Sequence, residues 1–110
     1  MNNFQLKHYC SRDGEDLFAK WLNALRDRHA QARVAARLVR LENGNFGDCK
    51  FVGSGVWELR VDYGPGYRVY YAQANKEVIL LCEGGDKRTQ QMDIDTAQSR
   101  WSEWQSRNKK

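Results

Sequence analysis

Histidine, cysteine and long apolar runs are scarce in this sequence of 110 residues. The two histidines, His8 and His29, lie far apart, so we expect no histidine-rich metal site. The three cysteines are an odd number without a Cys-x-x-Cys pair, which argues against a disulfide framework and favours small core residues. No segment approaches the roughly 18 apolar residues of a membrane span.

The first residues, Met1-Asn2-Asn3-Phe4, lack the basic start and the apolar run of a secretory signal peptide. We therefore expect a reduced, cytoplasmic protein that needs no cofactor and no metal ion and that has no membrane partner. Charged residues make up 29% of the chain and apolar residues 41%, which is ordinary for one globular domain over residues 1–110. The formal net charge of +4 is compatible with an anionic partner without requiring one.

The hydrophobic pattern predicts an α+β fold. Alternation predicts a first strand at residues 4–9, and helical spacing predicts a helix from Leu17 to Leu25 that Ser11 or Asp13 caps. A second helix is predicted at residues 30–42, ended by Asn43-Gly44. Further strands are predicted at residues 49–52, 56–62, 67–74 and 77–83. We expect a helical hairpin packed on an antiparallel β-sheet of about four strands, with a C-terminal helix.

The C-terminal helix is predicted to dock through an apolar stripe, either on the sheet or on the helix pair, and to fray at residues 105–110. Its start falls between Thr89 and Asp95, and the stripe consists of Ile94, Ala97, Trp101 and Trp104. Before it, residues 84–88 form a glycine-rich, cationic segment, Gly-Gly-Asp-Lys-Arg, which we expect to be a flexible loop.

Two arginines, Arg60 and Arg68, lie inside strands that are otherwise apolar and aromatic. A buried cation is costly unless its side chain reaches water or an anion, so one sheet face should be partly open. If the turn between these strands leaves an odd number of residues unpaired, both arginines share a face and can form a phosphate site. We predict this odd arrangement. The alternative for Arg68 is a cross-strand ion pair with Glu83, which a two-residue turn at Asn75-Lys76 would place opposite it.

The second predicted helix carries a basic stripe of Arg33, Arg37 and Arg40. Such a stripe is most often a solvated helix face. It can also contact an acidic partner or a nucleic acid.

Four segments together are similar to the RelE/ParE superfamily, the toxins of type II toxin–antitoxin modules. They are Glu58-Leu59-Arg60, Gly66 to Tyr71 (GYRVYY), Gly84 to Lys87 (GGDK) and Arg37 to Asp48 (RLVRLENGNFGD). The resemblance covers nearly the whole chain and is greatest for the addiction module killer protein branch, the HigB/Gp49-like proteins. It implies a RelE-like fold and a cognate antitoxin, expected to be a small helix-turn-helix protein.

The resemblance also implies a metal-independent, ribosome-associated mRNA endonuclease in which the ribose 2′-OH attacks the adjacent phosphate. The ribosome and mRNA would then be partners. Arg68 and Arg88 match positions where ribonuclease members keep functional arginines. The catalytic set implied is Arg60, Arg68, Lys87 and Arg88, with Glu58 either the general base or a salt-bridge partner of Arg60.

The remaining expected contacts are an RNA-binding set of Lys50, Tyr70, Arg60 and Arg68, with Tyr70 as a stacking surface, and an antitoxin-binding set of Arg33, Arg37 and Arg40. Ribonuclease members often have a C-terminal tyrosine or histidine that stacks on a base or transfers a proton. The nearest position here by spacing is Ile94, whose side chain can do neither. Two alternatives follow: a ParE-like poison of DNA gyrase, or a non-catalytic module component that only binds its antitoxin.

Overall fold

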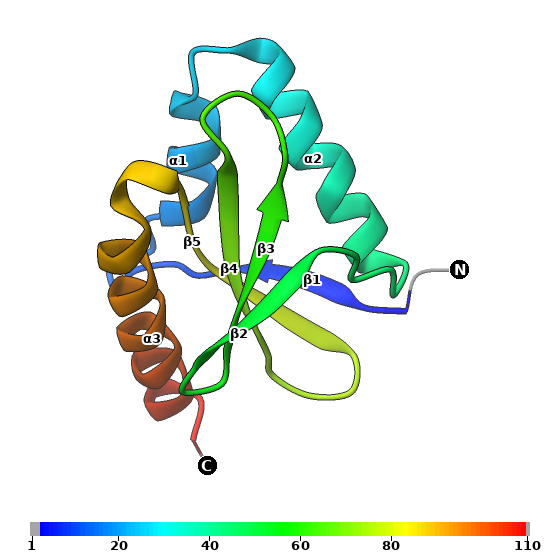
Figure 1. The fold of residues 1–110 in the computed structure, drawn as a ribbon. Helices are drawn as coiled ribbons and strands as arrows, with labels where there is room; N and C mark the ends of the chain where they lie inside the picture. Colours follow the sequence, from blue (N-terminus) through cyan, green and yellow to red (C-terminus); the bar gives the residue numbers. More distant parts are fainter. Residues whose placement is uncertain (1–2, 110) are drawn as a thin grey trace.

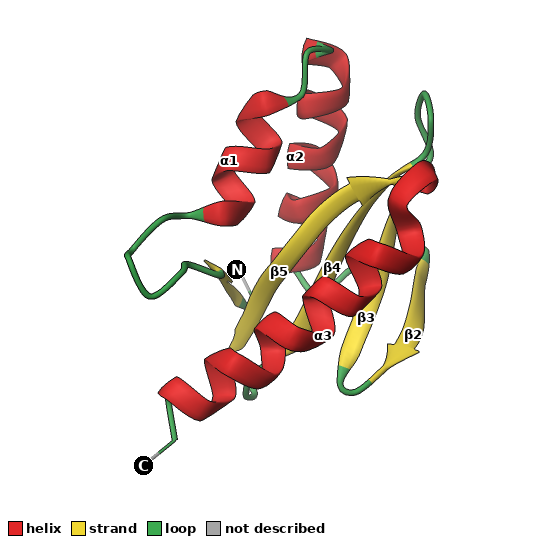
Figure 2. Cartoon of the chain, turned by 90° about the vertical axis from the view of Figure 1, so that its left-hand side faces the viewer, coloured by secondary structure: helices red, strands yellow, loops and turns green. Residues whose placement is uncertain are grey.

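A mixed β-sheet lies at the centre of the molecule, between helices on its two faces (Figures 1 and 2). The computed structural model describes residues 3–109. Within this range the sheet has five strands in the order β1-β5-β4-β3-β2. The strands are β1 (Gln5–His8), β2 (Cys49–Gly53), β3 (Val56–Val61), β4 (Tyr67–Gln73) and β5 (Val78–Asp86). The α+β class is confirmed.

The strand β1 makes the sheet mixed rather than antiparallel, because it pairs with β5 in the parallel direction. The other neighbouring strands are antiparallel. The expectation of a purely antiparallel sheet of about four strands was therefore wrong. The alternation of β1 indicates a strand but contains no information about its partner, which lies more than 70 positions away in the sequence.

The helices are α1 (Leu17–Ala24), α2 (Arg28–Glu42) and α3 (Gln90–Arg107), with a short 3-10 helix η1 (Lys87–Thr89) before α3. The cap of α1 is Asp16, whose side chain accepts a hydrogen bond from the Ala19 N–H, rather than Ser11 or Asp13. In the same way Asp27 caps α2 and starts it two residues earlier than predicted. At the other end of α2, Gly44 adopts a φ of 83°, as predicted for a glycine after a helix.

The two faces of the sheet carry separate cores. On one face the α1–α2 hairpin packs Phe18, Val34 and Leu41 against apolar side chains of β3, β4 and β5. On the other, α3 lies across the sheet, and its residues Ala97 and Trp101 pack on this face as predicted (Figure 2). The helix α3 extends to Arg107, which forms an ion pair with Glu103 at 2.8 Å, so the predicted fraying from residue 105 was wrong.

The register of β3 and β4 places Arg60 directly opposite Arg68. Residues 62–66 are left unpaired, an odd number, and both arginines lie on the face that α3 partly covers. The prediction of a shared face is confirmed. Arg68 does not face Glu83, however. The turn before β5 leaves three residues, 75–77, between the paired Ala74 and Val78, so the predicted two-residue turn at Asn75-Lys76 was wrong. A register shift between Tyr70 and Tyr71 then places Glu83 opposite Tyr70. Glu83 instead pairs with Arg100 of α3 at 3.1 Å.

The segment predicted as a flexible loop at residues 84–88 is ordered structure. Gly84, Gly85 and Asp86 continue β5, and Lys87 and Arg88 belong to η1. A side-chain carbon at Gly84 would overlap the indole of Trp21, and one at Gly85 would overlap the carboxylate of Asp93. These glycines are therefore needed for close packing of helices on both sides of β5 rather than for flexibility.

Over residues 3–109, no helix combines the length and apolar character that a membrane crossing requires.

The substitution Gly84→Ala should lower the free energy of unfolding by about 3 kcal/mol, because the added methyl group meets the rigid Trp21 ring. The matched control is Gly14→Ala. Gly14 has a φ of 84° but no neighbour within 4 Å of the added carbon. Only backbone strain of about 1 kcal/mol is expected there. Urea denaturation followed by circular dichroism measures both. Equal losses of stability in the two variants would contradict the packing role of Gly84.

Candidate nucleic-acid interface

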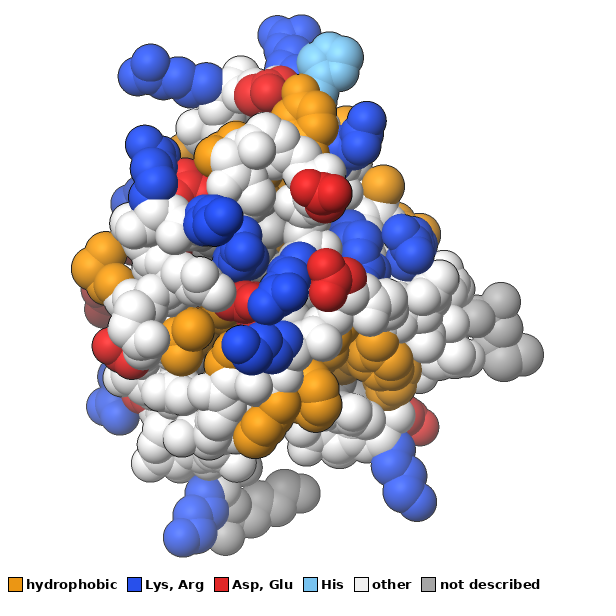
Figure 3. Space-filling view, in the orientation of Figure 1, with side chains coloured by type: hydrophobic (Ala, Val, Ile, Leu, Met, Phe, Trp, Pro, Cys, Tyr) orange, Lys and Arg blue, Asp and Glu red, His pale blue; other side chains and the backbone are white. Residues whose placement is uncertain are grey.

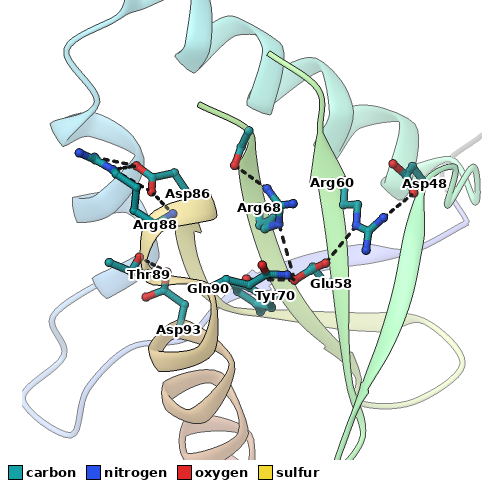
Figure 4. Close-up of polar contacts among 11 residues, drawn as sticks. Asp48, Glu58, Arg60, Arg68, Tyr70, Asp86, Arg88, Thr89, Gln90 and Asp93 are labelled. Atoms are coloured by element: carbon teal, nitrogen blue, oxygen red, sulfur yellow. Dashed lines mark hydrogen bonds and ion pairs between the residues drawn. The ribbon is translucent and has the colours of Figure 1, made fainter. Parts of the chain in front are cut away.

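A buried carboxylate, Glu58, organises the polar groups on the α3 face of the sheet (Figure 4). Its side chain is 0% exposed. It accepts hydrogen bonds from Arg60 Nε at 3.1 Å, from the Tyr70 hydroxyl at 3.2 Å and from Gln90 Nε2 at 2.7 Å. Arg68 Nε lies 3.7 Å from the same carboxylate. One carboxylate thus connects β3, β4 and the first residue of α3.

The partners of Glu58 keep it ionised. Burial raises the pKa of the Glu58 carboxyl, but hydrogen bonds from Gln90, Arg60 and Tyr70 and the charge of Arg68 lower the pKa below its ordinary value overall. A saturated carboxylate without solvent access is poorly suited to accept a proton from a substrate. Of the two roles considered for Glu58, the structure shows the ion pair with Arg60.

Arg60 and Arg68 line a pocket of about 280 Å³ at the open end of β3 and β4. Its other walls come from Lys87, from Asp48 and from the β3–β4 turn at Asp62 and residues 64–66. The side chain of Arg60 is 36% exposed and that of Arg68 is 12% exposed. Arg68 is fixed further by its Nη1, which donates to the Gly66 carbonyl at 2.6 Å. The pocket is therefore walled by three cations, two of them held in place.

A second pocket of about 330 Å³ continues from the first toward α2. Both pockets are lined by Asp48, Arg60, Val61 and Asp62. The strand β2 begins at Cys49, so the end of β3 has no neighbouring strand beyond this point, and the two pockets meet there. We call the two together the basic groove. Lysine and arginine side chains, with carboxylates between them, gather over the middle of this face of the molecule (Figure 3).

Three arginines of α2, Arg33, Arg37 and Arg40, line the second pocket but differ in exposure. Arg33 and Arg40 are exposed. Arg37 is only 8% exposed and donates to the Phe46 carbonyl. The expectation of one solvated stripe therefore does not apply to Arg37. Helical spacing placed the three residues correctly on one side, but it did not indicate the loop at Phe46 that covers the middle one.

The other predicted residues have different positions. Lys50 is exposed on β2 opposite Glu58, on the same face as Arg60. Arg88 lines neither pocket, and its exposed guanidinium pairs with Asp86 at 2.8 Å. Tyr70 is fully buried, and burial together with Glu58 raises its pKa. Its ring offers no face to a nucleotide base, contrary to the expected stacking role.

Two polar residues in contact with the glutamate–arginine cluster were not identified from the sequence. Gln90 carries no pattern signal, because it lies outside the apolar stripe of α3 and acts through its amide on Glu58. Asp48 is the last residue of the segment Arg37 to Asp48, which supports the family resemblance but indicates no role for this carboxylate. In the structure its carboxylate is 64% exposed and lies 4.0 Å from Arg60 Nη1.

A larger pocket of about 430 Å³ lies on the hairpin side of the sheet, with Phe46, Cys49, Trp57 and Tyr71 among its walls. Within the described chain no charged side chain lines it, so it has no evident part in phosphate chemistry. Among residues 3–109, no group of three or more histidine, cysteine, aspartate or glutamate side chains is placed to hold a metal ion.

The substitution Glu58→Gln should lower the free energy of unfolding at pH 7 by about 3 kcal/mol, because it removes the buried negative charge that two neighbouring guanidinium groups share. The folded pKa of Glu58 lies below the unfolded value of about 4.3. The stabilisation is therefore full above that value and is lost as the pH falls through the folded pKa. The difference from wild type should shrink between pH 7 and pH 3 in urea denaturation.

The control for this experiment is Glu15→Gln, which removes an exposed carboxylate paired with Lys20 at 3.0 Å. A change of less than about 0.5 kcal/mol is expected there. A Glu58→Gln deficit of the same size at pH 7 and at pH 3 would show that the charge of Glu58 is not what stabilises the site.

Comparison with known proteins agrees with part of the resemblance. Residues 20–102 match the family described as "Phage derived protein Gp49-like (DUF891)". A relative from Haemophilus influenzae, described as "Uncharacterized protein", is 49% identical over 80 residues, which cover 73% of this chain and 81% of the relative. The chain belongs to the Gp49-like phage-derived family, a family associated with toxin–antitoxin systems.

Proposed function

We propose that this protein is the toxin of a type II toxin–antitoxin module and that it cleaves mRNA without a metal ion, in the manner of RelE-like ribonucleases. The observation that carries this proposal is the pair Arg60 and Arg68. They are directly opposite each other, share one buried carboxylate and line one pocket with Lys87. Family membership supports an antitoxin partner. The mRNA substrate, the ribosome as the place of action and a cytoplasmic location follow from the proposed activity.

The proposed reaction begins when the ribose 2′-oxygen attacks the adjacent phosphorus as its proton leaves to a base. A bond from the 2′-oxygen to phosphorus forms, and the bond from phosphorus to the 5′-oxygen breaks. A proton goes to that oxygen, leaving a 2′,3′-cyclic phosphate and a 5′-hydroxyl. Negative charge grows on the phosphoryl oxygens during attack. Cations already fixed around these oxygens lower the barrier, because they need not reorganise.

Each groove residue has a proposed role in this reaction. Arg60 and Arg68 bind the phosphoryl oxygens through their planar guanidinium groups. Lys87, exposed at the rim, is placed to protonate the leaving oxygen. Glu58 acts as a positioning residue, because its buried carboxylate holds both arginines. Asp48 and Asp62 are the accessible carboxylates, and Asp48, which lies 4.0 Å from Arg60, is the one proposed to take the 2′-proton.

The substitution Arg68→Ala should reduce mRNA cleavage by about 10²- to 10³-fold and relieve growth inhibition, because it removes a fixed cation from the charge-bearing phosphate. Cleavage is measured in a cell-free translation reaction by mapping mRNA 5′ ends. The matched control is Arg12→Ala, which removes an exposed guanidinium that pairs with Glu103 away from the groove. This control should cleave like wild type.

Three results would contradict the proposal. Full toxicity of Arg68→Ala would exclude a catalytic role for this arginine. Intact mRNA together with trapped cleavage complexes of DNA gyrase would favour a ParE-like poison. A wild-type chain that is harmless when expressed alone, yet binds its antitoxin, would favour a non-catalytic component.

A further inference from the structure

The second pocket of the basic groove has the features of a preformed binding site. Four arginines line it: Arg33, Arg37, Arg40 and Arg60. Asp48 and Asp62 are its carboxylates, so its lining keeps an excess of positive charge. Only Arg60 among the four arginines forms an ion pair with either carboxylate within residues 3–109. Arg33, Arg37 and Arg40 therefore line the pocket without forming an ion pair in the described part of the chain.

Arg37 is the most informative of these residues. It is more than nine-tenths buried, and its Nη2 donates to the Phe46 carbonyl. Its Nη1 is buried and has no hydrogen-bond partner in the described part of the chain. Gly47, with a φ of 58°, leaves the room in which this guanidinium lies, because a side-chain carbon there would overlap Nη2. Burying a guanidinium with an unused donor costs free energy, which an anionic ligand would recover.

The β3–β4 turn next to this pocket is attached to the start of α2. Tyr63 of the β3–β4 turn donates its hydroxyl hydrogen to Asp27, the cap of α2, at 3.0 Å. Arg33 lies over the Tyr63 ring, with its Cζ 5.1 Å from the ring centroid. These contacts tie the turn to the start of α2 and hold the two sides of the groove at a set separation. Three of the four arginines, Arg33, Arg37 and Arg60, thus each have a protein contact that holds the side chain before a ligand binds.

We propose that this second pocket is a phosphate subsite for the RNA backbone, one that binds a phosphate next to the one held by Arg60 and Arg68. This inference rests on the proposed ribonuclease function and adds a substrate contact to it. The two pockets share Arg60, so a chain with successive phosphates can occupy both at once. Guanidinium forks match phosphate oxygens in pairs, and the continuity with the first pocket favours a polynucleotide over an acidic protein segment.

The subsite acts on binding rather than on the chemical step. An interaction with a phosphate that does not react stabilises the bound substrate and the transition state equally. Removing this interaction should therefore raise KM and Kd and leave kcat nearly unchanged. The effect should also be confined to RNA long enough to reach both pockets.

The experiment measures binding of 2′-O-methyl oligoribonucleotides, which cannot undergo 2′-OH attack, by fluorescence anisotropy at several salt concentrations. Wild type is compared with Arg37→Gln, Arg40→Gln and the control Arg28→Gln, an exposed arginine of α2 outside the pocket. For an eight-nucleotide probe we expect Kd to rise about 10-fold in the Arg37 and Arg40 variants. The salt slope should fall by about 0.7 for each phosphate that a variant no longer neutralises. For a dinucleotide probe, with one phosphodiester, the variants should match wild type.

The exposed Arg40 keeps the test valid if Arg37→Gln fails to fold, which thermal denaturation reports. If wild type cleaves mRNA but both variants bind the eight-nucleotide probe like Arg28→Gln, the subsite is excluded and the proposed function stands. If the variants lose RNA affinity while wild type cleaves no mRNA, the subsite stands as an RNA-binding site and the nuclease does not. Variants that lose only antitoxin binding would assign this surface to the antitoxin and overturn the inference.

Discussion

The attraction between one buried carboxylate and two arginines is the constraint on which this structure depends. Arg60 and Arg68 occupy directly opposite positions on neighbouring strands, where like charges repel each other. Glu58, two residues before Arg60 on the same face, lies within 4 Å of both guanidinium groups. Its burial costs free energy that the two arginines, Tyr70 and Gln90 offset together. The cluster keeps an excess positive charge, and this excess lines the pocket.

The same cluster sets the position of α3. The first residue of the helix, Gln90, donates to Glu58, and Gly85 lets Asp93 of the helix approach β5 closely. Asp93 and Glu83 behave differently from Glu58, because burial raises the pKa of each and their favourable partners do not reverse this. Glu58, Glu83 and Asp93 thus differ in the direction of their pKa shifts, because different donors and charges surround them. The carboxyl group with the lowered pKa is that of Glu58, which Arg60 and Arg68 contact.

The sequence indicated the strands, the docking stripe of α3 and the shared face of Arg60 and Arg68, because alternation and turn parity determine which side chains point together. It did not reveal the parallel partner of β1, or the three-residue turn and register shift that separate Arg68 from Glu83, since the periodicity of a single segment determines none of these. The burial of Arg37 and Tyr70 was missed for the same reason. A periodic pattern indicates which side chains share a face of a helix or strand, but not what covers that face. The loop at Phe46 covers Arg37, and α3 covers Tyr70.

Charge distribution, rather than total charge, is what supports the proposal of a polyanionic partner. The formal net charge of +4 alone does not distinguish a nucleic-acid-binding protein from many other domains. In the folded chain, six cationic side chains line the basic groove, while its carboxylates are Asp48, Asp62 and the buried Glu58 behind them. The groove thus holds an excess of three positive charges, most of the charge of the whole protein. Because β2 ends the sheet on one side and starts only at Cys49, this charge lies along an open path between α2 and the β3–β4 turn. A linear ligand with regularly spaced negative charges fits such a path better than a compact anion, which could occupy only one pocket at a time.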